Sequence, residues 1–124
     1  MKSHQLMRRA TALLASAVAV VAFSAMEAQA TVAETSHGCP SGAFCIYPEN
    51  AGWNDDRPSH IFWSGPYNLH NQVGKHIVFN NQTDGWVVDL CVGYNGTDCR
   101  WYMLDGAVSN LDLTMINSVV LRPR

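Results

Sequence analysis

Positive charge is scarce in this chain, and beyond its first thirty residues it has no long apolar run. From residue 31 onward the sequence holds five Lys and Arg against nine Asp and Glu, and Lys75 is the single lysine there. The resulting net charge of −4 argues against nucleic acid and anionic membranes as partners. No window shows helical periodicity over more than two turns, so the sequence does not predict a helical bundle.

The N-terminus carries the pattern of a secretory signal peptide. Arg8 and Arg9 close a positive start, the uncharged run Ala10–Met26 follows, and Ala28-Gln29-Ala30 supplies a small-x-small cleavage site. A membrane anchor is the alternative, but seventeen uncharged residues fall short of the ~20 that a span needs. We therefore expect cleavage after Ala30, a secreted protein, and no membrane contact of the mature form.

Removal of residues 1–30 leaves 94 residues, enough for one domain with a modest core. Residues 31–38 are small and polar and predict a flexible tail, so the domain is expected to span 39–124. An even number of cysteines in a short exported chain indicates two disulfides. The cysteines are Cys39, Cys45, Cys91 and Cys99. Three pairings are possible, and the spacings favour two local loops, 39–45 and 91–99. Zinc is the alternative, but the paired C-x2-C spacing of structural zinc sites is absent.

Turn-forming residues interrupt the domain every few positions, and the short runs between them are rich in aromatic and β-branched residues. These runs are Ala43–Tyr47, Ile61–Trp63, His76–Phe79, Trp86–Val92, Trp101–Leu104 and Ser118–Leu121. Short strands at such spacing are typical of an all-β sandwich.

Two short markers recur in the same order in the two halves of the domain. The first marker is Phe44-Cys45-Ile46 and again Leu90-Cys91-Val92. The second is Asn68-Leu69 followed by Ile77-Val78-Phe79, and again Asn110-Leu111 followed by Val119-Val120-Leu121. Chance among β-rich segments is the alternative to a duplicated unit of about forty residues. A unit of that size fits one four-strand Greek key, and two such units pack face to face.

The opening of the domain, Cys39-Pro-Ser-Gly-Ala-Phe-Cys45-Ile-Tyr47, resembles the start of the secreted actinobacterial peptidase inhibitors typified by the Streptomyces metalloproteinase inhibitor. A second short cysteine loop, here Cys91 to Cys99, and the closing segment Ile116–Leu121 are similar too. The resemblance implies a βγ-crystallin-like double Greek-key sandwich that inhibits an extracellular, thermolysin-like metalloprotease. It implies that the second loop is presented as a substrate, with Cys91-Val92 as the reactive bond. We expect a monomer.

Two other interpretations of the same residues remain. Asn95-Gly96 is a strong type I′ turn signal, so the second loop is equally compatible with a plain disulfide-closed hairpin. The domain is also rich in aromatic residues, and an exposed subset could stack on sugars. That would make the protein a non-inhibitory extracellular binding or antimicrobial module for cell-wall glycans. The aromatic residues are Trp53, Trp63, Trp86, Trp101, Tyr47, Tyr67, Tyr94 and Tyr102.

Motifs for catalysis and metal binding are absent from the sequence. It contains no G-x-S-x-G and no H-E-x-x-H, and pairing leaves no free cysteine, so we expect no enzymatic activity. Many βγ-crystallin modules bind calcium through an [N/D]-[N/D]-x-x-[S/T]-S segment. The matching stretches, 71–76 and 113–118, keep only Asn71 and Ser118 of its polar groups. Calcium takes six to eight oxygen ligands, so we expect no metal and no other cofactor.

Overall fold

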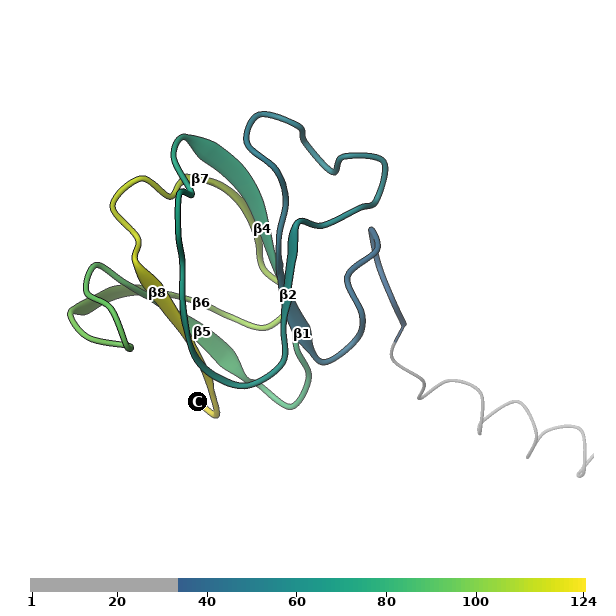
Figure 1. Cartoon of the computed structure of the whole chain (residues 1–124). Helices are drawn as coiled ribbons and strands as arrows, with labels where there is room; N and C mark the ends of the chain where they lie inside the picture. The colour runs from purple at the N-terminus through teal and green to yellow at the C-terminus, as the bar shows by residue number, and fades with distance from the viewer. Residues whose placement is uncertain (1–33) are drawn as a thin grey trace, which may run out of the picture. The chain divides into compact units, whose positions relative to one another are not determined.

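The computed structural model describes residues 34–124 (Figure 1). The predicted signal peptide, residues 1–30, lies outside the described residues, and so do residues 31–33 of the predicted tail. Within the part of the chain that is described, no helix is long and apolar enough to cross a membrane.

Eight strands, all paired antiparallel, form two four-stranded sheets, and residues 34–124 contain no helix. In chain order the strands are β1 (Ala43–Ile46), β2 (His60–Phe62), β3 (Gly65–Asn68), β4 (Lys75–Asn81), β5 (Val87–Cys91), β6 (Cys99–Met103), β7 (Val108–Asp112) and β8 (Ser118–Arg122). The all-β prediction is confirmed.

The two halves of the domain exchange one strand each. The first sheet has the order β2-β1-β4-β7 and the second has the order β3-β8-β5-β6. The third strand of the first half, β3, therefore pairs in the second sheet, while β7, the third strand of the second half, pairs in the first. Because neither half completes a four-stranded sheet alone, the two halves form one folding unit.

The main core consists of side chains from both sheets. Phe44 and Ile46 of β1 share it with Val88 and Leu90 of β5, and all four are buried. Alternate residues of a strand point to opposite faces, so these pairs spaced by two mark the inner face of each sheet. Burial of each such side chain contributes roughly 1.5–3 kcal/mol, which makes this core the main stabilising element of the domain.

The repeat expected from the sequence aligns the last strands of the two halves one residue out of step. Val78 of β4 and Val119 of β8 both lie in the main core. The expected alignment instead matched Val78 with Val120, which is only partly buried. A shift of one residue moves a strand side chain to the other face of its sheet, so the alignment within these strands was wrong.

A second, smaller core lies on the opposite face of β1, around the Cys39–Cys45 disulfide. Tyr47 is buried there, and its hydroxyl donates a hydrogen bond to the His37 carbonyl at 2.6 Å. The His37 ring stacks on Trp53 with 3.7 Å between the ring centroids. These contacts attach the end of the predicted tail to the domain.

Candidate functional site: the loop between Cys91 and Cys99

One row of paired residues crosses the second sheet and ends at a disulfide. Asn68 of β3 is paired with Ser118 of β8, Ser118 with Cys91 of β5, and Cys91 with Cys99 of β6. The Cys91–Cys99 disulfide therefore joins two neighbouring strands where the loop 92–98 leaves the sheet. Both local disulfide pairings favoured by the sequence are confirmed.

The loop 92–98 is a tight hairpin. Asn95 and Gly96 have φ angles of 57° and 70°, the positive values that a type I′ turn needs at both central positions. Thr97 N closes the turn on the Tyr94 carbonyl at 3.3 Å. A Cβ atom at Gly96 would lie 2.7 Å from a methyl group of Val120, so the close approach of the turn to β8 needs glycine. The hairpin predicted from Asn95-Gly96 is confirmed.

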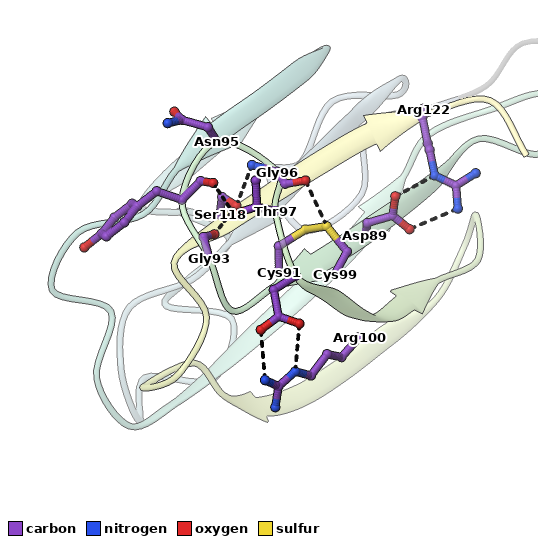
Figure 2. The surroundings of a disulfide bond; sticks show 12 residues. Asp89, Cys91, Gly93, Asn95, Gly96, Thr97, Cys99, Arg100, Ser118 and Arg122 are labelled. Carbon is purple, nitrogen blue, oxygen red and sulfur yellow. Dashed lines mark hydrogen bonds and ion pairs between the residues drawn. A yellow bond between two sulfur atoms is a disulfide. The ribbon is translucent and has the colours of Figure 1, made fainter.

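Ser118 of β8 makes hydrogen bonds to both arms of this hairpin. Its side chain is fully buried, and its hydroxyl donates to the Gly93 carbonyl at 2.6 Å and accepts from Gly96 N at 2.9 Å. Figure 2 shows the hydroxyl between the two strands of the hairpin, beside the disulfide. A single buried side chain thus bridges both arms of the loop, which restricts the freedom of its two glycines.

Two asparagines complete the support. Asn68 accepts from Asn95 N at 2.7 Å and donates to the Asn95 side-chain oxygen at 3.0 Å, so it fixes the tip of the loop. Asn117 donates from its side-chain nitrogen to the Val92 carbonyl at 2.7 Å, so it fixes the base. We call Asn68, Asn117 and Ser118 the loop clamp.

The predicted reactive bond, Cys91-Val92, lies at the base of the hairpin. Cys91 is fully buried, and its carbonyl accepts a hydrogen bond from Asn117 N at 2.9 Å. Val92 N donates to the Asp98 carbonyl at 2.9 Å. Both polar atoms of this peptide bond are therefore paired within the domain. At the tip, Tyr94 leaves half of its surface open to solvent.

Charge is confined to the edges of the site. Arg100 donates two hydrogen bonds to Asp98, at 3.1 and 2.8 Å, and they lower the pKa of that carboxyl below its usual value. Arg122 makes a similar pair with Asp89 on the other side of the disulfide (Figure 2). Solvent screens exposed pairs of this kind, so they contribute little to stability. The tip of the loop, residues 94–97, carries no charge, so shape and hydrogen bonding would decide what it binds.

The sequence predicts a role in the site for the two cysteines and Val92, but it predicts none for the loop clamp. In the sequence, Asn68 belongs to a repeat marker, while Ser118 belongs to a predicted strand and to the remnant of a calcium motif. The available signal was a polar residue at the start of an apolar strand, since Ser118 opens the run Val119–Leu121. A buried hydroxyl at such a position needs a partner, and the adjacent hairpin supplies two.

No group of three or more His, Cys, Asp or Glu side chains that could hold a metal ion occurs among residues 34–124. Comparison with known protein families, curated proteins and solved structures finds no match to this chain.

Proposed function

We propose that this protein is a secreted, non-enzymatic inhibitor of thermolysin-like metalloproteases that acts as a monomer through the loop 92–98. The observation that carries the proposal is the loop clamp, because it holds a disulfide-closed loop in one conformation before any partner binds. A loop that is already ordered loses less conformational entropy on binding, which favours tight complexes. A flexible loop with two glycines would lack that advantage.

We also infer that the fold is a βγ-crystallin-like double Greek key. The strand orders β2-β1-β4-β7 and β3-β8-β5-β6 support it, since each half contributes three strands to one sheet and one to the other. Two disulfides fit an oxidising, extracellular environment, where such bonds persist. Export through residues 1–30 is part of the same proposal.

The proposed reactive bond, Cys91-Val92, would be hydrolysed slowly. A zinc protease polarises the carbonyl of the bond that it cuts, so the Cys91 carbonyl would first have to leave Asn117 N. After the cut, the disulfide would keep Cys91 joined to Cys99, and the hydrogen bond from Asn117 to the Val92 carbonyl would keep the new end in place. Product release would then be slow, and the enzyme would stay occupied.

Titration of thermolysin with the mature protein tests the proposal. We expect a stoichiometric loss of protease activity and a product one water heavier, cut before Val92. Val92→Ala shrinks the side chain meant for the apolar pocket of the enzyme and should raise the inhibition constant by about tenfold. Val108→Ala, at an exposed position on β7, is the matched control and should leave it unchanged. Full protease activity at micromolar concentrations of the protein would refute the proposal.

A further inference from the structure

A small hollow lies at the other end of β5 from the candidate inhibitory loop. Its volume is about 150 Å³, and three segments line it: the turn before β1, the connection between β2 and β3, and the connection from β4 to β5, which crosses into the second half. The lining residues are Gly42, Trp63, Gln82, Thr83 and Trp86. Residues 82–86 lead into β5, whereas the loop 92–98 follows it, so roughly 13 Å of strand separates the two sites (Figure 1).

Two indole rings supply the apolar part of this hollow. Trp63 leaves 53 % of its surface exposed, which is unusual for so large an apolar side chain, and Trp86 is half-buried. Gly42 has no side chain to fill the space, and a Cβ atom there would lie 3.8 Å from the Trp63 ring. Flat aromatic faces of this kind carry a partial negative charge and attract polarised C–H groups.

Gln82 supplies a polar floor. It is only 6 % exposed, and its side-chain nitrogen donates to the Asn80 side chain at 2.9 Å and to the Val87 carbonyl at 3.4 Å. Its side-chain oxygen accepts no hydrogen bond from any residue between 34 and 124. Within that range, every side-chain nitrogen or oxygen that is sealed from solvent has a hydrogen-bond partner, so an unpaired oxygen is not sealed. The oxygen therefore keeps contact with solvent, and Gln82 is one of the residues that line the hollow. A largely buried amide oxygen gains most from a ligand that brings a donor.

None of the five lining residues is ionisable, so the hollow does not favour a charged ligand. A ligand that suits it has a polarised C–H face for the indoles and hydroxyl donors for Gln82 and Thr83. A pyranose ring has both. We propose that this hollow binds a sugar ring of a neutral polysaccharide, which would give the protein a second, glycan-binding site. This site is independent of the proposed protease inhibition, because it lies at the opposite end of β5.

Titration of the ¹⁵N-labelled mature protein with two neutral oligosaccharides, cellotetraose and chitotetraose, tests the proposal. The two probes differ in the acetamido group, so the stronger binder identifies the class of glycan. We expect at least one to shift the indole N–H signals of Trp63 and Trp86 and the side-chain amide signal of Gln82. The signals of Trp101 should not move.

Matched variants decide whether the hollow is the site. Trp63→Ala should weaken binding by at least about tenfold, whereas Trp101→Ala, at an equally exposed indole on β6, should leave it unchanged. Thr83→Ala, which removes one hydroxyl from the rim, should weaken binding without affecting the fold. Circular dichroism checks that each variant is folded. No binding of either sugar at about 10 mM, or an equal loss in the Trp63 and Trp101 variants, would overturn the proposal.

Discussion

Replacing Ser118 with alanine should loosen the loop 92–98 while leaving the sandwich intact. The buried hydroxyl makes two hydrogen bonds, at 2.6 Å to the Gly93 carbonyl and 2.9 Å from Gly96 N, and the substitution removes both. At about 1 kcal/mol for each bond, the closed hairpin loses about 2 kcal/mol relative to open conformations. That loss corresponds to about a 30-fold rise in the population of the open loop. Alanine fits the same space, so packing around β8 is unaffected.

Amide hydrogen exchange measures this opening residue by residue. We expect the Gly96 amide of Ser118→Ala to exchange about 30-fold faster than in the wild type, with the amides of β1 and β4 unchanged. Cleavage within the loop by an added protease should accelerate by a similar factor. Ser109→Ala is the control, because Ser109 is a strand residue whose hydroxyl makes no hydrogen bond within residues 34–124. Unchanged exchange at Gly96 would show that the clamp does not hold the loop.

Three further variants address stability. Burial, with Asp56 as a second cause, raises the pKa of Tyr47 to about 12. Because the unfolded chain already ionises near pH 10, the free energy of unfolding should fall by about 2–3 kcal/mol between pH 10 and pH 12, and Tyr47→Phe should abolish this fall in urea titrations. Combined Cys91→Ser and Cys99→Ser should reduce the free energy of unfolding by about 2–3 kcal/mol, measured the same way. Burial, with His76 as a second cause, lowers the pKa of His60 below 6.5 in the folded protein. Because the unfolded chain then binds the proton more readily, stability should fall as the pH drops below 6.5, and His60→Gln should reduce that fall in thermal melts.

The strands that the sequence predicted and those that it missed differ in amino-acid composition. Aromatic and β-branched runs located six strands to within a few residues, for example His76–Phe79 inside β4. The two strands without such a run are β3 and β7. Both lie at the edge of a sheet and bury only alternate residues in part. The other two edge strands, β2 and β6, were predicted because they carry aromatic residues in a run, which β3 and β7 lack. These are also the two strands that the halves exchange.

The candidate site was predictable only in part, because only its local features leave a signal in the sequence. The two cysteines and the Asn95-Gly96 turn are local signals, and local signals located the hairpin. The loop clamp depends on pairing between distant segments, because Asn68 reaches the loop only when β3 joins the second sheet beside Ser118. No periodicity within a short window reports such a pairing. A single buried hydroxyl is equally hard to find, since its role appears only when both of its partners are placed.

The strand exchange gives the two copies of the Asn-Leu marker different roles. Asn68 ends β3 directly below the hairpin 92–98, and it makes two hydrogen bonds to Asn95. Asn110 holds the matching place in β7, but the connection on its side of the domain, residues 47–59, is longer, and the Asn110 side chain makes no hydrogen bond within the described part of the chain. Asn68→Ala should therefore speed exchange of the Asn95 amide by about tenfold, while Asn110→Ala leaves every loop amide unchanged. An equal effect of both variants would mean that the marker stabilises the strands generally, and that the exchange of β3 has no part in holding the loop.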